Sequence, residues 1–242
     1  MNVHRSIHVG ATALPVLKSG QLMKLRRAAG GAVVAAGLLV AGLAVPAEAA
    51  AATVYQAPLR TAVLGLPVAA EVNAGYDRDR YFGVWGDTNG DCQNTRQEVL
   101  VQESKGAVTY TNRGCMASRG RWVTTWDNGV HTSATEVEVD HLVPVHEAWG
   151  SGARYWSQAR RVAFYNDLGD SRTLNVQTAA LNHSKRASGP ERWLPPKNRC
   201  AYITQWVAVK IRWGLSVNIT EKAALILYAA SCPNVTLTVT RV

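Results

Sequence analysis

Polar and apolar side chains alternate in the stretch Glu136-Val137-Glu138-Val139, a little past the middle of the chain. In an extended chain successive side chains point to opposite sides, so the two valines share one face and the two glutamates share the other. This period of two predicts a strand with one buried face. Pro144 predicts that the strand has ended by that position, because proline has no backbone N–H to donate to a neighbouring strand.

Shorter extended segments are predicted on both sides of this strand. Residues 99–101, 108–110 and 173–177 are short runs of strand-forming residues. Residues 121–126 alternate weakly and lead into 127–129, Asp-Asn-Gly, which is a strong hairpin turn because Asn and Gly tolerate positive φ. The chain is expected to return from this turn as a strand that runs into the alternating stretch.

Five segments are predicted to be helices, namely 60–66, 156–168, 178–185, 201–213 and 220–230. The last of them begins with a threonine and a glutamate, which suit a helix cap and a first helical turn. The chain shows no internal repeat. A mixture of short strands and helices without repeats predicts a single domain of the α+β class.

The first 49 residues have the pattern of a secretory signal peptide. Three basic residues between positions 24 and 27 precede an apolar run at 28–45, and an Ala-x-Ala site follows. We expect cleavage after Ala49, and no membrane association after it, because the apolar run is too short and too rich in Ala and Gly for a stable span. Met23 stands directly before the basic residues and is an alternative start.

The exported part of the chain is expected to divide into a leader or linker, residues 50–75, and a domain, residues 76–242. Residues 50–75 are rich in alanine and have no clear period. Removal of residues 1–49 leaves 21 basic and 16 acidic residues, a net charge of +5. A modest positive charge suits a polyanionic partner, but it is equally typical of a secreted protein with no such partner.

Four cysteines, Cys92, Cys115, Cys200 and Cys232, all fall in the exported part. In an oxidising compartment an even number of cysteines predicts two disulfides, for which three pairings are possible. The local pairing joins the first cysteine to the second and the third to the fourth. A four-cysteine zinc site is disfavoured because no C-x-x-C pair is present.

Asp140 and His141 stand next to each other where the predicted strand ends. A carboxylate can bind a hard cation, and an imidazole can accept a proton near neutral pH. The structural alternative is that Asp140 caps a turn and His141 is an ordinary polar residue. A second polar cluster follows downstream, and Asn182, on the helix predicted there, is suited to a ligand role.

The spacing of these residues resembles a known family. Asp140-His141 with Pro144, then Asn175-Val176-Gln177, then Asn182-His183-Ser184-Lys185, is similar to the HNH endonucleases, also called ββα-metal or His-Me finger nucleases. The longer run, from DHLVPVHEAWGSGARYW through LNHSK, resembles more closely a group of secreted actinobacterial HNH-family proteins that contain the domain called DUF1524. The resemblance extends over residues 76–193.

The resemblance implies a ββα-metal core with short antiparallel strands and several surrounding helices. It implies that Asp140 and Asn182 hold one divalent cation, Mg²⁺ first, with Mn²⁺, Ca²⁺ and Zn²⁺ as alternatives. His141 would be the general base in phosphodiester hydrolysis. Asn175 would fasten the connecting loop and help to orient the base, and Lys185 would contact a phosphate.

Other polar residues are weighed outside this motif. Arg96 could bind a phosphate, because its planar fork suits an anion, or it could form a structural ion pair. His146 and His183 match no catalytic position. Residues 87–98 resemble a calcium loop, but Cys92 stands where that loop needs glycine, which favours a polar turn fixed by a disulfide.

The sequence therefore predicts a secreted, metal-dependent endonuclease of low sequence preference that acts as a monomer on DNA, with RNA as an alternative substrate. No base-reading module is visible beside the motif, and no immunity partner can be identified. One alternative is a secreted binding protein that keeps the finger as a structural metal site. Another is a zinc-dependent cell-wall hydrolase using Asp140, His141 and His146, although no H-E-x-x-H helix is present.

Overall fold

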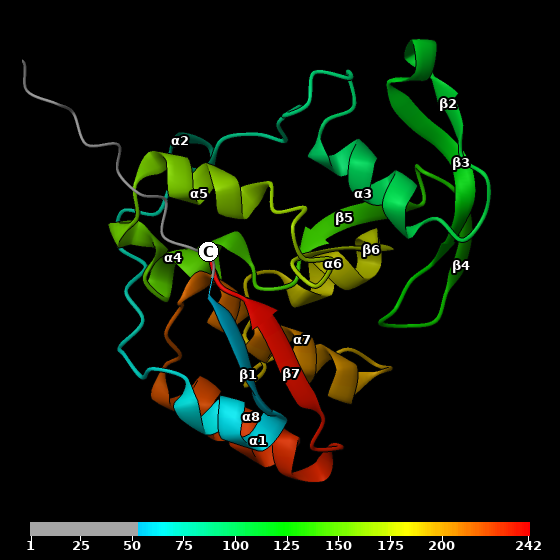
Figure 1. Ribbon diagram of the computed structural model, residues 1–242. Helices are drawn as coiled ribbons and strands as arrows, with labels where there is room; N and C mark the ends of the chain where they lie inside the picture. Colours follow the sequence, from blue (N-terminus) through cyan, green and yellow to red (C-terminus); the bar gives the residue numbers. More distant parts are fainter. Residues whose placement is uncertain (1–52) are drawn as a thin grey trace, which may run out of the picture. The chain divides into compact units, whose positions relative to one another are not determined.

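The computed structural model describes residues 53–242, and its elements mix short antiparallel strands with helices (Figure 1). The strands are β1 Val54–Pro58, β2 Thr109–Thr111, β3 Met116–Val123, β4 Val130–Ser133, β5 Val137–His141, β6 Leu174–Thr178 and β7 Thr236–Thr240. The helices are α1 Leu59–Gly65, α2 Arg78–Phe82, α3 Thr95–Glu103, α4 Val145–Gly150, α5 Gln158–Tyr165, α6 Ala179–Lys185, α7 Arg199–Trp213 and α8 Ile219–Ser231. The described residues fall within one compact unit, so the prediction of a single α+β domain is confirmed.

Strand β5 is the alternating stretch, and it pairs antiparallel with β6. Its two valines, Val137 and Val139, are buried, as the period of two predicted. The pairing places Asp140 opposite Asn175. Helix α6 follows β6 directly, and its first turn is capped by the side chain of Thr178, which accepts a hydrogen bond from the amide of Leu181. β5, β6 and α6 thus form a strand–strand–helix unit, the arrangement expected from the sequence.

The connection between β5 and β6 contains α4 and α5 and is fastened at its base. The amide of Leu142 donates to the carbonyl of Thr173, which extends the pairing of the two strands by one more bond. The carboxylate of Asp167 accepts hydrogen bonds from the Thr173 hydroxyl, from Arg212 and from the indole of Trp213. A buried carboxylate with several charge-assisted partners holds this long connection against α7.

The N-terminal part of the domain corrects the expectation of a linker at residues 50–75. β1 pairs in antiparallel fashion with the last strand, β7, and α1 packs beside α8 (Figure 1). Leu59, Ala62 and Val63 of α1 are buried in the main core. The alanine-rich composition concealed this role, because the apolar partners of the segment lie far away in the sequence. The predicted signal peptide and its cleavage site lie outside the described residues.

A second correction concerns residues 99–101, which were expected to be a strand and belong to α3. The side chain of Asn94 accepts a hydrogen bond from the amide of Gln97 and caps this helix. Three adjacent apolar residues cannot by themselves distinguish a strand from a buried helical turn. The neighbouring turn at 127–129 is confirmed, with Asn128 at φ 62° between β3 and β4.

Both disulfides follow the local pairing, Cys92 with Cys115 and Cys200 with Cys232. The first joins the loop before α3 to the start of β3, and the second joins the start of α7 to the end of α8. All four cysteines are consumed in these bonds, so they cannot form a zinc site. Among residues 53–242, no helix combines the length and the apolar character that a membrane crossing requires.

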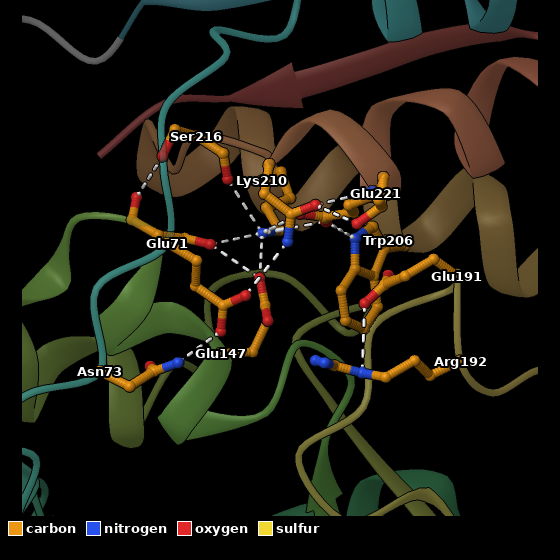
Figure 2. Close-up of polar contacts among 12 residues, drawn as sticks. Glu71, Asn73, Glu147, Glu191, Arg192, Trp206, Lys210, Ser216 and Glu221 are labelled. Atoms are coloured by element: carbon orange, nitrogen blue, oxygen red, sulfur yellow. Dashed lines mark hydrogen bonds and ion pairs between the residues drawn. The ribbon is translucent and has the colours of Figure 1, made fainter.

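Three buried charges meet in the core between α4, α7 and α8. Lys210 Nζ lies 2.7 Å from Glu147 Oε1 and 3.0 Å from Glu221 Oε1 (Figure 2). Burial alone would lower the pKa of Lys210, but the two carboxylates outweigh it and raise the pKa. The ammonium also donates to Ser151 Oγ and to the carbonyl of Ser216, so each of its protons has an acceptor. The Lys210 ammonium therefore compensates the two buried carboxylates, and without it their burial would be unfavourable.

Replacement of Lys210 by methionine is expected to lower the free energy of unfolding by about 3–5 kcal/mol, because it leaves two buried carboxylates without a cation. Urea unfolding at pH 7 measures the change. Lys197→Met is the matched control, since Lys197 is exposed, and it should change the free energy by less than about 0.5 kcal/mol. A loss no larger than that of the control would contradict the assigned role of the cluster.

A pH dependence of stability is expected from Glu103. Its Oε2 accepts a hydrogen bond from the amide of Val176 at 3.0 Å, and burial raises its pKa to about 7. The unfolded carboxyl ionises near its usual pKa of about 4.5. The stabilisation is therefore complete below pH 4.5 and is lost as the pH rises through 7.

The variant Glu103→Gln keeps an acceptor for Val176 and carries no charge. Between pH 5 and pH 8, its free energy of unfolding should rise relative to that of the unmodified protein by about 1 kcal/mol, after allowance for partial solvent screening. Urea unfolding at the two pH values tests this. An equal difference between the two proteins at both pH values would show that the Glu103 carboxyl is not perturbed by burial.

Candidate active site

The end of β5, the start of α4, α6 and the segment before α2 enclose a cavity of about 300 Å³. The polar and aromatic residues that line it are Tyr76, Arg78, Asp140, His141, His146, Asn182, His183 and Arg186. The first two precede the strand–strand–helix unit by some sixty residues, and the others belong to that unit, follow it directly or belong to α4. The structure thus brings together Asp140, His141 and Asn182, which were expected to act together.

The imidazole of His141 is buried and held in one orientation. Its Nε2 lies 2.9 Å from the carbonyl oxygen of Tyr165, and its ring stacks on Trp85 at a centroid distance of 5.1 Å. A carbonyl can only accept a hydrogen bond, so Nε2 carries the proton and Nδ1 has a free lone pair. Within the described residues no hydrogen bond reaches Nδ1, and this atom is not closed off from solvent. Burial lowers the pKa of His141 to about 3, so the ring is neutral near pH 7.

Asp140 is fixed by two donors on one of its oxygens. Gln177 Nε2 and Lys185 Nζ both donate to Oδ2. Burial raises the pKa of Asp140, while the Lys185 ammonium opposes that shift. In the part of the chain that the structure describes, no hydrogen bond occupies Oδ1, and the carboxylate lines the cavity. One oxygen is therefore held by protein and the other is available to a ligand.

Asn182 is oriented by Glu138. Its Nδ2 donates to Glu138 Oε2 at 2.8 Å. A carboxylate only accepts, so the amide nitrogen must face Glu138, and the amide oxygen is directed elsewhere. The donor chemistry at the cavity is therefore a carboxylate oxygen of Asp140 and an amide oxygen of Asn182. Oxygen donors of this kind fit a hard divalent cation such as Mg²⁺ that keeps several waters.

Lys185 has a position different from the expected phosphate contact. Its side chain is buried, with 1% of the residue exposed, and its ammonium donates to Asp140, to the carbonyl of His141 and to the carbonyl of Leu142. Three acceptors use all three protons of the ammonium. Lys185 fastens α6 to the end of β5 from inside the domain.

Asn175 and Arg96 also lie away from the cavity. Asn175 Oδ1 accepts a hydrogen bond from the indole of Trp126 at 3.2 Å, and the connection that Asn175 was expected to fasten is held by Thr173. Arg96 is half-buried on α3, where burial lowers its pKa and the charge of Glu138 opposes that shift. Neither side chain lines the cavity.

Two further histidines, His146 and His183, also line the cavity. His146 packs edge to face against Tyr76 at 4.7 Å. His183 is exposed, and its Nε2 lies 3.8 Å from Glu138 Oε1. Between residues 53 and 242, no three His, Cys, Asp or Glu side chains are arranged to hold a metal ion. This gives no support to a zinc site built on His141 and His146.

The resemblance to a calcium loop at residues 87–98 is explained by a turn. The two oxygens of Asp87 accept hydrogen bonds from the amides of Gly90 and Cys92. Cys92 has φ 72° and is held by its disulfide. The carboxylate of Asp87 therefore caps a tight turn.

The roles of several residues that shape the site were not predicted from the sequence. Tyr165, Gln177 and Trp85 hold His141 or Asp140, and Glu138 holds Asn182. The stretch YDRDRYFGVW at 76–85 is dense in aromatic and charged residues, and this composition was its only signal. Glu138 had a clearer signal, since it lies two positions before Asp140 on the same face of β5.

Fold and site together define a disulfide-bonded α+β domain of a nuclease-related family. The chain belongs to the family described as GmrSD restriction endonucleases, C-terminal domain, which matches residues 94–227. It is 38% identical over 160 residues to an uncharacterized secreted protein of Arthroderma benhamiae, covering 65% of this chain and 76% of that protein. No solved structure matches the chain. The protein is secreted, as this relative and the two disulfides indicate.

The tautomer of His141 can be tested by NMR on the metal-free protein. We expect a neutral ring protonated on Nε2 throughout the range from pH 7 to pH 5, because burial lowers the pKa to about 3. A long-range ¹H–¹⁵N correlation spectrum distinguishes the two ring nitrogens, and a His141→Gln variant assigns the signal. A ring protonated on Nδ1, or doubly protonated at pH 6, would contradict the orientation described above.

Proposed function

We propose that the protein is a secreted, metal-dependent endonuclease that hydrolyses phosphodiester bonds of DNA with little sequence preference. The observation that carries the proposal is the hydrogen bond from His141 Nε2 to the Tyr165 carbonyl. It leaves Nδ1 as the basic nitrogen of His141, a residue that lines the cavity together with Asp140 and Asn182. The nuclease-related family of the chain supports the same reading.

In the proposed reaction, His141 Nδ1 takes a proton from a water molecule as the water oxygen attacks phosphorus. The Tyr165 carbonyl accepts the hydrogen bond from Nε2 throughout and stabilises the positive charge that develops on the ring. The bond from phosphorus to the 3′ oxygen breaks, the departing 3′ oxygen takes a proton from solvent water, and His141 releases its proton to solvent, which leaves a 5′-phosphate and a 3′-hydroxyl.

Asp140 and Asn182 would hold one divalent cation at this site, with Mg²⁺ as our first expectation. When bound, such a cation supplies Lewis-acid stabilisation to a phosphate oxygen and to the leaving group. Gln177 and Lys185 restrain the Asp140 carboxylate, and Glu138 orients the Asn182 amide. These contacts fix both ligands before a cation or a substrate arrives, which is the preorganisation that electrostatic catalysis needs.

The proposal is tested by incubating the purified mature protein with plasmid DNA and Mg²⁺, with and without EDTA. We expect nicking and linearisation that EDTA abolishes. His141→Ala should lower kcat by about 10²- to 10⁴-fold, the usual contribution of a general base. His131→Ala is the matched control, because His131 lies on β4 and does not line the cavity. Parallel reactions with Mn²⁺, Ca²⁺, Zn²⁺ and single-stranded RNA define the cation and the substrate.

No cleavage with any of these cations would refute the nuclease proposal and favour a secreted binding protein that keeps the site without turnover. A cleavage rate for His141→Ala equal to that of the His131→Ala control would refute the assignment of His141 as the base. Cleavage that does not respond to EDTA would refute the metal requirement.

A further inference from the structure

Arg78 faces the cavity from outside the strand–strand–helix unit. It is the first residue of α2, and its side chain lines the cavity together with Asp140 and His141. One guanidinium nitrogen, Nη2, donates to the hydroxyl of Tyr165 at 2.6 Å. The guanidinium carbon lies 5.3 Å from the centroid of the same ring. The position of Arg78 is therefore set by Tyr165.

Tyr165 holds two groups of the site at once. Its side-chain hydroxyl accepts from Arg78, and its backbone carbonyl accepts from His141 Nε2. A single residue at the end of α5 thus fixes the guanidinium relative to the proposed base. Such a shared support keeps two functional groups in register better than two independent loops would.

The charge of Arg78 is not neutralised by a neighbouring carboxylate. Among the ion pairs of the described residues none includes Arg78, and the nearby Asp77 caps α2 by accepting from the amide of Arg80. Of the five N–H donors of a guanidinium, one is used by Tyr165. The others are available to an anion.

The cavity is also lined by a second arginine, Arg186, directly after α6. It is exposed. The negative charge of Asp140 is balanced by Lys185 from inside the domain. A cavity lined by two arginines and by a carboxylate that a buried lysine balances suits a phosphate group, which arginine can bind through two parallel hydrogen bonds.

We infer that Arg78 is a substrate-binding residue that holds the DNA phosphate at the candidate active site, positioned for this by Tyr165. The inference rests on the proposed function, and it adds the group that binds the substrate backbone. Tyr165 acts through Arg78 and His141 and is a positioning residue.

The experiment measures binding and cleavage separately. A fluorescein-labelled 20-base-pair duplex is titrated with the mature protein in EDTA, by anisotropy, at several salt concentrations between 50 and 200 mM. We expect Arg78→Ala to weaken binding about tenfold or more at the lowest salt and to reduce the slope of log K against log salt by about one. Plasmid cleavage should show a raised KM, with kcat reduced less than in His141→Ala.

Arg80→Ala is the matched control. Arg80 lies on the same helix, two positions away, but stacks on Tyr81 and does not line the cavity. It should leave the salt slope within error of the unmodified protein. Tyr165→Phe removes the hydroxyl and keeps the backbone carbonyl, so it should weaken binding in the same direction as Arg78→Ala without changing the tautomer of His141. Arg78→Lys should restore the salt slope but only part of the affinity.

Circular dichroism confirms that each variant is folded, and Arg78→Lys and Tyr165→Phe decide the question if Arg78→Ala does not fold. A salt slope and affinity for Arg78→Ala equal to those of Arg80→Ala, in a protein that cleaves plasmid, would overturn this inference and leave the proposed function intact. Absence of both binding and cleavage in the unmodified protein would overturn the two together.

Discussion

The buried ammonium group of Lys185 holds the candidate site in one arrangement. It joins α6 to the end of β5 through the Asp140 carboxylate and two backbone carbonyls. A buried ammonium that loses its partner costs several kcal/mol, so Asp140 cannot turn away and α6 cannot shift along the sheet. Since His141 is adjacent to Asp140, this contact fixes the positions of both the proposed metal ligand, Asp140, and the proposed base, His141. The position of Asn182 then follows from its place one turn earlier on α6, and Glu138 orients its amide.

The strand–strand–helix unit could be predicted from the sequence because its signals are local. The alternation at 136–139, the helix that begins at 178 and the adjacent Asp140 and His141 at the end of the strand are all read within short windows. Each of these features has the position in the structure that its pattern indicated. The disulfide pairing was also accessible, since each bond closes a loop between neighbouring elements.

The parts that could not be predicted depend on contacts between distant residues. Arg78 and Tyr165 are separated by 87 positions, and neither has a spacing that indicates a partnership. The same holds for β1, whose partner strand is the last one in the chain. Lys185 shows a different limit. Its position in the motif was read from the sequence, but the direction of its side chain depends on which face of α6 the core covers. A lysine at that position is compatible with phosphate binding and with burial beside a carboxylate.

The pairing of β1 with β7 has a consequence for how the molecule is made. Strand β1 has no partner until residues 236–240 have been synthesised. The sheet of β1 and β7, which packs on α1 and α7, therefore cannot form on an incomplete chain. The Cys200–Cys232 bond likewise needs the end of α8. Final closure of the domain therefore requires the chain through residue 240.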